Sequence, residues 1–322
     1  MKNSNIDKLK EISKKVRRNI IEEVYGANSG HPGSSLSCVE ILTVLYFDQM
    51  NINPENPKME NRDKLVLSKG HASPALYSIL AQRGYFDIEE LKEFRKLGSR
   101  LQGHPDLKKL PGVDMSAGSL GQGLSSACGM AIGNKLKNNN NRVYCVLGDG
   151  EIEEGQVWEA AMTATHYKLD NLCVIIDNNN LQIDGKIENV MNPYPIDKKF
   201  ESFGFEVLKC DGHDEQDLIN TFEKAKTIKE KPVAIIAKTV KGKGISYMED
   251  KAEWHGKAPN EEQYKQAINE LLWKIIAFWR CWTSFRKMLM YNKYTPLFLT
   301  CSPSQIHNSF PNYDFIIERK NN

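Results

Sequence analysis

Four short apolar runs rich in β-branched residues constrain the fold of this chain most strongly. They are RVYCVL at 142–147, LCVIID at 172–177, FEVLKC at 205–210 and VAIIAKTV at 233–240. Helix-like segments separate them, at 154–167, 196–203 and 214–228. Strands that are buried on both faces and alternate with helices form parallel sheets. We therefore predict an α/β fold, a parallel sheet with helices on both faces.

The segments before these runs are predicted to be helical. Apolar residues recur at steps of three and four between residues 5 and 25, as on one face of an amphipathic helix. Residues 35–50 begin with a serine cap and are mostly apolar, which predicts a buried helix. The stretches at 73–84 and 87–98 each end at a glycine, as helices often do.

Charge and cysteine usage exclude several classes of protein. The chain has 43 basic and 41 acidic residues, so charge gives no reason to expect nucleic acid or a membrane as a partner. The seven cysteines are scattered and form no C-x-x-C motif, which favours a reducing compartment. No apolar run is long enough to span a bilayer, and the N-terminus lacks the apolar core of a signal peptide. We expect a soluble, cytoplasmic protein.

The last fifty residues differ in composition from the rest. Residues 273–322 contain three of the five tryptophans, no glycine, seven basic residues and two acidic ones. They are either a divergent extension or a segment that selection has not shaped for this fold, such as the product of out-of-frame or read-through translation. We favour the second alternative. The predicted domains are therefore a folded domain at 1–272 and an atypical tail at 273–322 that is not part of the fold.

An acidic residue between two glycines, Asp149 in VLGDGE, directly follows the run at 142–147. Asn179 lies thirty residues further on, after the run at 172–177. The carboxyl ends of neighbouring parallel strands meet at one edge of a sheet. Asp149, Asn179 and the backbone carbonyl of Leu181 would form an oxygen-only ligand set, which suits Mg²⁺ (or Ca²⁺ or Mn²⁺) with phosphate oxygens and water. We therefore predict a cation that bridges to a diphosphate, with glycines that let the backbone approach this ligand closely. The motif GDG taken alone is more typical of an ordinary turn.

Further motifs surround this stretch in a fixed order. They are SGHPGSSLS at 29–37, DKLVLSKGHASPALY at 63–77, GHPD at 103–106, SAGSLGQGLSSACGMA at 116–131 and KTVKGKGISYMEDKAEWHGKAP at 238–259. Together with LGDGEIEEG and DNNNLQIDG, they resemble the transketolase family over residues 5–271. The resemblance covers the diphosphate-binding half of that enzyme, which is about twice this long. It implies the thiamine-diphosphate-binding fold, with a PP-type domain, and the cofactor thiamine diphosphate with Mg²⁺.

The resemblance also implies which residues contact the cofactor. Asp149, Asn179 and the Leu181 carbonyl correspond to the metal ligands. Ser119 stands where many full-length members have proline, and backbone contacts stay possible there. The positions that correspond to cofactor contacts, besides the metal ligands, are His71, Gly118, Ser119, Leu120, Gly150 and His255.

Histidines are the implied catalytic groups. His31, His104 and His255 match the histidines around the reacting sugar, and Glu154 matches a glutamate of a hydrogen-bond relay across the dimer interface. Transfer of a ketol unit moves protons at hydroxyl groups near neutral pH, and histidine has a suitable ordinary pKa. A solvent-exposed or structural role remains the alternative for each. Two further histidines, at 166 and 213, are predicted to be structural.

In this family a carboxylate from a second, pyrimidine-binding domain activates the cofactor, and no stretch here resembles that domain. The expected function is therefore the N-terminal subunit of a split transketolase, transferring a two-carbon ketol group between phosphorylated sugars. It would be inactive without a C-terminal partner subunit, in a dimer of heterodimers. Two alternatives stay open. One is a relative acting on pyruvate or a 2-oxo acid, like 1-deoxyxylulose-5-phosphate synthase or a 2-oxo acid dehydrogenase. The other is a truncated cofactor-binding chain without catalysis.

Overall fold

The computed structural model describes residues 2–272, with side chains from residue 5 onward. The predicted tail at 273–322 lies outside the described residues, so the division of the chain into a folded domain and a tail stays a prediction. None of the helices within 2–272 has the length and apolar character needed to cross a membrane.

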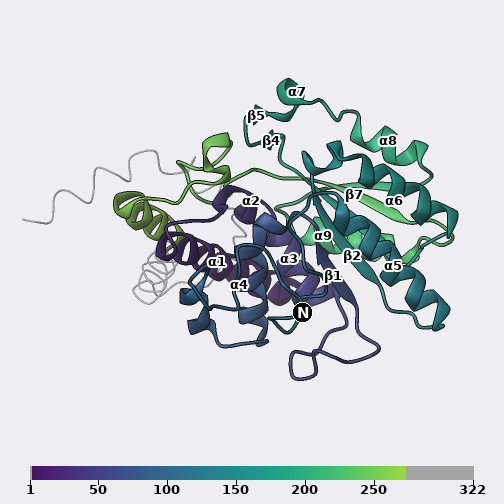
Figure 1. Cartoon of the computed structure of the whole chain (residues 1–322), viewed down its shortest axis with the longest axis horizontal. Helices are drawn as coiled ribbons and strands as arrows, with labels where there is room; N and C mark the ends of the chain where they lie inside the picture. The colour runs from purple at the N-terminus through teal and green to yellow at the C-terminus, as the bar shows by residue number, and fades with distance from the viewer. Residues whose placement is uncertain (1, 273–322) are drawn as a thin grey trace, which may run out of the picture. The chain divides into compact units, whose positions relative to one another are not determined.

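A parallel sheet forms the centre of the fold (Figure 1). Its strands, in the order β1-β2-β3-β7-β6, all run in the same direction. The four predicted runs are confirmed as strands. Three strands within 2–272 were not predicted: β1, whose three apolar residues between Lys64 and Ser68 give too short a pattern, and the two-residue strands β4 and β5. The bounds are β1 Lys64–Leu67, β2 Val143–Gly148, β3 Leu172–Asn178, β6 Glu206–Asp211 and β7 Val233–Lys238; a separate antiparallel pair is β4 Leu181–Gln182 with β5 Gly185–Lys186.

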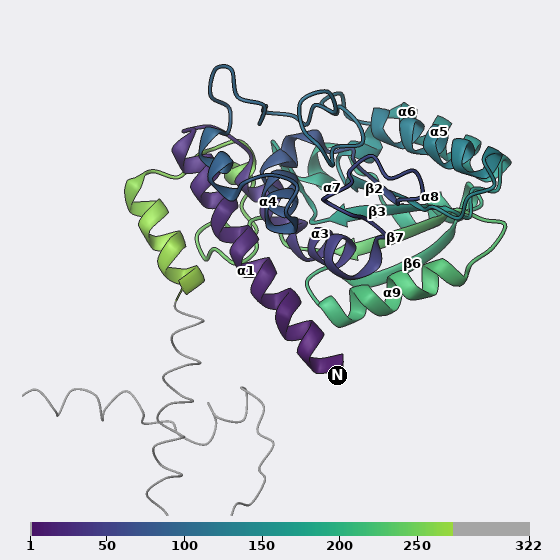
Figure 2. The same cartoon turned by 90° about the horizontal axis from the view of Figure 1, so that it is seen from below.

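Helices cover both faces of the sheet, which confirms the predicted fold class (Figure 2). Alternate side chains of β3 enter the two cores, Ile175 on one face and Val174 and Ile176 on the other. One core contains α1 Lys2–Gly26, α3 Val39–Val44, α4 Ser73–Arg83 and α9 Glu215–Thr227. The other contains α5 Gln122–Leu136, α6 Gly155–His166 and α8 Ile196–Ser202.

Two predicted helices differ from the observed ones. Residues 35–50 do not form one helix but are divided among α2 Pro32–Ser37, α3 and the π-helical turn η1 Leu45–Gln49, with a break at Cys38. Beside the break the Ser37 hydroxyl donates to the carbonyl of Ser34, and such local bonds compete with a regular helix. The segment at 87–98 contains only the 3₁₀ turn η3 Ile88–Glu93, because the backbone turns at Phe94, whose ring is buried in the core.

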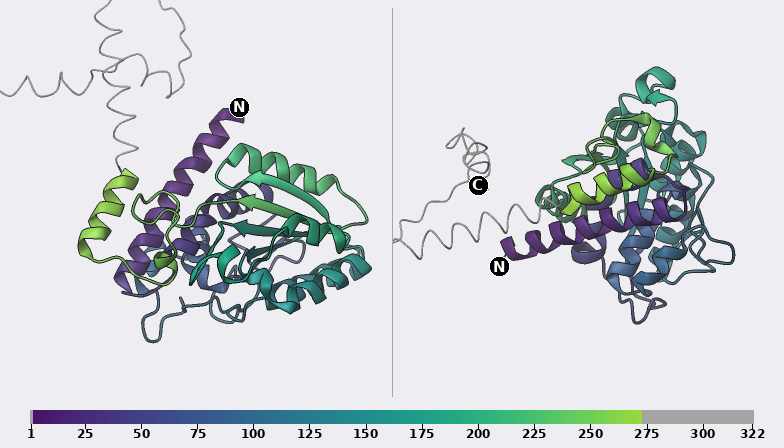
Figure 3. Two further views of the ribbon diagram at one scale, coloured as in Figure 1. Left: turned by 90° about the horizontal axis from the view of Figure 1, so that it is seen from above. Right: turned by 90° about the vertical axis from the view of Figure 1, so that its left-hand side faces the viewer.

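The remaining elements are short and lie around the carboxyl edge of the sheet or at the end of the described chain. Residues 261–272 are helical and lie beside α1 (Figure 3), where Tyr264 stacks on Tyr25 with ring centroids 4.1 Å apart. The short elements are η2 Gly70–Ala72, η4 Glu151–Glu153, α7 Ile187–Val190 and η5 Ala252–His255.

Candidate functional site

The predicted metal-ligand positions lie on neighbouring loops at the carboxyl edge of the sheet. Strands β2 and β3 pair with Gly148 opposite Asp177, so the residues that follow each strand meet. The buried Asp149 carboxylate accepts hydrogen bonds from the backbone N–H of Asn180 at 2.6 Å and of Gly150 at 2.9 Å. Asn179 is buried beside it, and its side-chain oxygen accepts from the N–H of Leu181 at 3.1 Å. The three oxygen groups are thus presented at one edge.

The glycines around Asp149 provide space rather than unusual backbone angles. Neither Gly148 nor Gly150 has a positive φ. A Cβ atom at Gly150 would lie 3.3 Å from the Cβ of Gln182, so a side chain there would crowd the β4 strand. Burial, and then the nearby Asp177 carboxylate, raise the pKa of Asp149 to about 7. A cation next to Asp149 would relieve both effects.

A buried ion pair that the sequence did not reveal lies directly behind this edge. Lys69 pairs with Asp177, which also accepts hydrogen bonds from the hydroxyls of Ser37 and Thr239. Burial would raise the pKa of Asp177, but the Lys69 charge together with the hydrogen bonds from Lys69, Ser37 and Thr239 outweighs burial and keeps this pKa below its usual value. Asp177 also accepts from the Asn179 amide at 3.5 Å, so the ion pair helps to orient a predicted metal ligand.

A second buried lysine, Lys241, was also not among the site residues predicted from the sequence. Its Nζ donates to the Leu181 carbonyl at 3.1 Å and lies 2.8 Å from Nδ1 of His255. Burial lowers its pKa to about 8, although the Asp149 carboxylate acts in the opposite direction. One signal for Lys241 was available in the sequence, since it lies in a glycine-rich turn directly after a predicted strand.

Three of the predicted histidines form a cluster next to this edge. The ring centroids of His31, His71 and His255 lie 5.0–5.3 Å apart. Burial lowers the pKa of all three, to about 4 for His31 and about 3 for His255, and well below its usual value for His71. Nearby cations, Lys241 foremost for His255, act in the same direction. The imidazoles are therefore neutral at neutral pH, and Nδ1 of His31 is buried without a hydrogen-bond partner.

The other predicted residues are exposed or half-buried. His104 is exposed, and a Cβ at Gly118 would lie 3.5 Å from its ring. Next to Gly118 in the sequence, Ser119 is exposed and Leu120 is half-buried. Glu154 is exposed in the single chain. It packs against Gly121, where an added Cβ atom would lie only 2.8 Å from the Cβ of Glu154.

The buried glutamate of the motif LGDGEIEEG is Glu151, which was not among the predicted site residues. It accepts hydrogen bonds from the Ser68 hydroxyl and from the backbone N–H groups of Gly121 at 2.9 Å and Gly148 at 3.0 Å. These contacts join the loops that follow β1 and β2 to the start of α5. Glu151 therefore holds the backbone around Asp149 in place.

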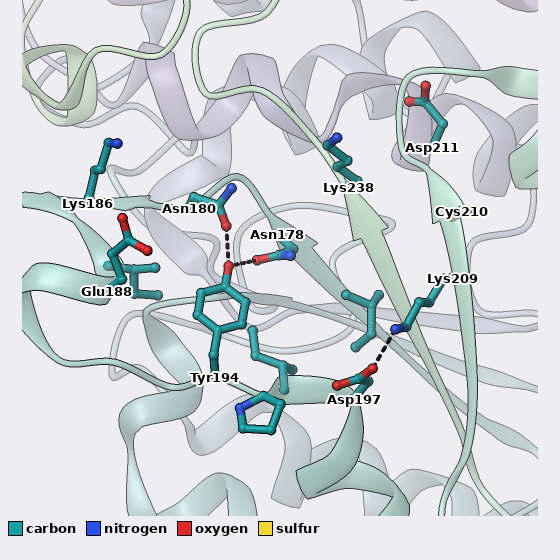
Figure 4. A pocket seen from close by; sticks show the side chains of 14 residues that line it. Asn178, Asn180, Lys186, Glu188, Tyr194, Asp197, Lys209, Cys210, Asp211 and Lys238 are labelled. Carbon is teal, nitrogen blue, oxygen red and sulfur yellow. Dashed lines mark hydrogen bonds and ion pairs between the residues drawn. The ribbon is translucent and has the colours of Figure 1, made fainter.

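A separate pocket of about 770 Å³ opens beyond the ends of β3, β7 and β6 (Figure 4). Tyr194 forms its centre, with its hydroxyl bonded to Asn178 at 2.8 Å and to Asn180. None of the predicted site residues lines it. Its ionic side chains balance in charge and so indicate no class of ligand; they are Lys186, Lys209, Lys238, Glu188, Asp197 and Asp211.

The residues at the edge fit a ligand that carries both signs of charge. Asp149 is a buried carboxylate that lacks a side-chain cation in hydrogen-bond contact among residues 5–272, and Lys241 is a buried ammonium held by neutral groups. Within 2–272, no group of three or more His, Cys, Asp or Glu side chains is arranged to hold a metal ion. The available donors are instead one carboxylate, one amide and one carbonyl, which suit a hard cation that keeps phosphate and water ligands. A metal diphosphate satisfies both features.

Comparisons with known proteins agree on one family. The family model described as "Transketolase, thiamine diphosphate binding domain" matches residues 8–279. A protein of Phocaeicola vulgatus that is named as one subunit of apulose-4-phosphate transketolase is 42% identical over 266 residues, covering 83% of this chain and 94% of the relative. The 6-deoxy-6-sulfo-D-fructose transketolase subunit SqwG of a Clostridium species is 43% identical over 256 residues, covering 80% and 93%.

Longer relatives match over only part of their length. Human transketolase is 44% identical over 266 residues, which are 82% of this chain but 42% of the human protein. The crystal structure of transketolase from Campylobacter jejuni superposes with a TM-score of 0.77 at 39% identity, covering 82% of this chain and 42% of that one. The chain thus spans about two-fifths of these longer proteins and nearly all of the separate subunits.

Proposed function

This chain belongs to the transketolase family, and we propose that it is the N-terminal subunit of a split enzyme that transfers a two-carbon ketol group between phosphorylated sugars. The lengths of its relatives support this division of the enzyme: the match covers 94% and 93% of two proteins named as subunits, against 42% of human transketolase. The observation that carries the activity is the cluster of three neutral histidines beside the Asp149 edge.

In this proposal the edge of β2 and β3 holds thiamine diphosphate and a divalent metal, Mg²⁺ or else Ca²⁺ or Mn²⁺. The metal ligands are Asp149, Asn179 and the Leu181 carbonyl. Lys241 places an ammonium group against the same carbonyl, where it meets the negative charge of the diphosphate. The proposed cofactor contacts beyond these are His71, Gly118, Ser119, Leu120, Gly150 and His255.

The histidines move protons at the sugar hydroxyls. When bound, thiamine diphosphate supplies the carbon nucleophile that carries the two-carbon unit. In this proposal His31, His104 and His255 would face the reacting sugar, because neutral imidazoles accept a proton or a hydrogen bond from a hydroxyl group. The low pKa of His31 and His255 keeps them in this accepting form. Glu154 acts outside this cluster, in the hydrogen-bond relay between subunits.

A partner subunit with the pyrimidine-binding domain completes the site, in a dimer of heterodimers located in the cytoplasm. Exposure of Glu154 in the single chain is in keeping with an interface between subunits there. The β4–β5 connection and α7, which follow the metal ligands, carry the exposed apolar residues Ile183, Val190 and Met191. Apolar side chains gathered beside a site of this kind favour a covering partner.

The two relatives that are separate subunits are named for different sugars, apulose-4-phosphate and 6-deoxy-6-sulfo-D-fructose. We propose a phosphorylated ketose as donor for this chain. Reconstitution tests the proposal: the full chain is mixed with a pyrimidine-binding subunit, to be sought in the reading frame downstream, and with thiamine diphosphate, Mg²⁺, a xylulose phosphate donor and an aldose phosphate acceptor.

Ketol transfer that requires both chains and both cofactors is the expected result. Turnover of pyruvate or another 2-oxo acid without sugar transfer would assign the chain to the other branch of thiamine-diphosphate enzymes. Cofactor binding without any turnover in the reconstituted complex would favour the non-catalytic alternative.

A further inference from the structure

The loop that carries Lys241 is held on both sides of that residue. On one side, the backbone N–H of Val240 donates to Nε2 of His213 at 2.9 Å. On the other, the carbonyl of Lys243 accepts from Nε of Arg17 at 2.9 Å. The loop between these contacts contains Gly242, with φ of +77°, and a glycine in this conformation gives the backbone little rigidity of its own. Within this loop the N–H of Asp250 donates to the Lys241 carbonyl at 3.0 Å and the N–H of Gly242 donates to the Gly33 carbonyl at 3.0 Å. The contacts at Val240 and Lys243 add to these bonds and fix the two ends of the loop.

Both holding side chains converge on one carboxylate. The guanidinium of Arg17 donates to both oxygens of Glu40, at 2.8 Å for the Nη2–Oε2 bond. Nδ1 of His213 lies 2.8 Å from Oε2 of the same Glu40. Arg17 lies on α1, Glu40 on α3 and His213 between β6 and α9, and all three side chains are largely buried. The three form one network that ends at the Lys241 loop.

The hydrogen bonds fix the protonation of His213. Its Nε2 accepts a hydrogen bond from the backbone N–H of Val240, so Nε2 carries no hydrogen. The ring proton is then on Nδ1 and is donated to Glu40. His213 is therefore neutral, with Nδ1 bonded to the Glu40 carboxylate and Nε2 bonded to the loop that carries Lys241.

We propose that Glu40, through His213 and Arg17, positions Lys241 in the cofactor site, so that these three residues set the affinity for the metal diphosphate without touching it. They are positioning residues, and the inference rests on the proposed function. Lys241 Nζ reaches both the Leu181 carbonyl and His255, so a displacement of its backbone changes the metal-ligand edge and the histidine cluster together.

Two substitutions of the same histidine separate positioning from general stability. His213→Gln places an amide oxygen near the position of Nε2, where it can still accept from Val240. His213→Asn places its amide near the position of Nδ1 and leaves the Val240 N–H without its acceptor. His166→Asn is the matched control, because His166 is exposed at the end of α6. All are made in the full chain.

Two measurements are made on each variant. Calorimetric titration with thiamine diphosphate and Mg²⁺, in the presence of the partner subunit, gives the affinity. Hydrogen–deuterium exchange of the ligand-free chain reports on the loop at 239–244. We expect His213→Asn to weaken binding by about tenfold or more and to speed exchange of this loop by a similar factor, the scale of one lost buried hydrogen bond. His166→Asn should stay close to the wild type. His213→Gln, which keeps the acceptor for Val240 but loses the bond to Glu40, should show a smaller loss than His213→Asn.

The outcomes are distinguishable. Unchanged affinity and exchange in His213→Asn would overturn the inference, and so would a lower melting temperature with unchanged affinity. If the wild-type chain does not bind the cofactor with the partner subunit present, the proposed function fails, and the exchange measurement alone then decides whether His213 holds the loop. Should His213→Asn not fold, Arg17→Lys tests the other contact, since lysine keeps the charge beside Glu40 but loses the bond to Lys243.

Discussion

Breaking the buried ion pair behind the candidate site should destabilise the chain strongly. The side chains of Lys69 and Asp177 are 1% and 0% exposed, and the ammonium group also donates to the Ser34 carbonyl at 2.8 Å. Lys69→Met keeps the length of the side chain but removes its charge. Asp177 is then left as a buried carboxylate that only neutral donors stabilise.

The magnitude follows from the burial. Removing one partner of a buried pair costs about 3–5 kcal/mol, because the remaining charge has no compensation. This is a large share of the about 5–15 kcal/mol that stabilises a typical domain. The matched control is Lys135→Met. Lys135 pairs with Asp170 at 2.8 Å, and the two side chains are 37% and 20% exposed. A pair so open to solvent contributes about 1 kcal/mol or less.

Urea unfolding of the full chain at pH 7, followed by tryptophan fluorescence, measures these costs. The double variant Lys69→Met with Asp177→Asn should recover part of the stability lost in Lys69→Met, because it no longer buries an unpaired charge. A cost below about 1 kcal/mol for Lys69→Met, or strictly additive single and double variants, would refute the reasoning. In that case water or a shifted backbone must compensate Asp177.

The remaining predictions concern the site, acid stability and the tail. Asp149→Ala should abolish Mg²⁺-dependent binding of thiamine diphosphate in calorimetric titrations with the partner present, and unchanged affinity would remove the metal assignment. His31→Ala and His255→Ala should lower kcat/KM by about 10²- to 10⁴-fold with cofactor affinity nearly retained; normal turnover would make both structural. Burial raises the pKa of Glu40, but Arg17 and His213 outweigh it and lower the pKa to about 2 from the ordinary 4.5. The ionised Glu40 therefore contributes about 3 kcal/mol of stability above pH 4.5, and this contribution is lost as the pH falls through 2. In acid unfolding curves, Glu40→Gln should lack this pH dependence. Deleting 273–322 should shift the melting temperature by only a few degrees, whereas a loss above about 3 kcal/mol would show that the tail is folded.

Local sequence patterns determined the architecture. Four β-branched runs separated by helical segments predicted a parallel sheet covered on both faces, because burial on both sides leaves a nearly continuous apolar pattern in the sequence. The same logic placed Asp149 and Asn179 at one edge, since neighbouring parallel strands end together. These inferences succeed because each depends on residues close in the sequence or on the direction of the strands alone.

Only the tertiary structure revealed which polar side chains are buried and what they contact. Neither Lys69 nor the glycine-rich turn around Lys241 shows in the sequence that the side chain is buried, because a lysine gives the same local pattern whether it faces water or a buried carboxylate. The network of Arg17, Glu40 and His213 joins residues 23 and 173 positions apart, and no periodicity encodes such a meeting. The low pKa of Glu40 follows from how α1, α3 and the β6–α9 connection pack together, which is decided by the fold as a whole.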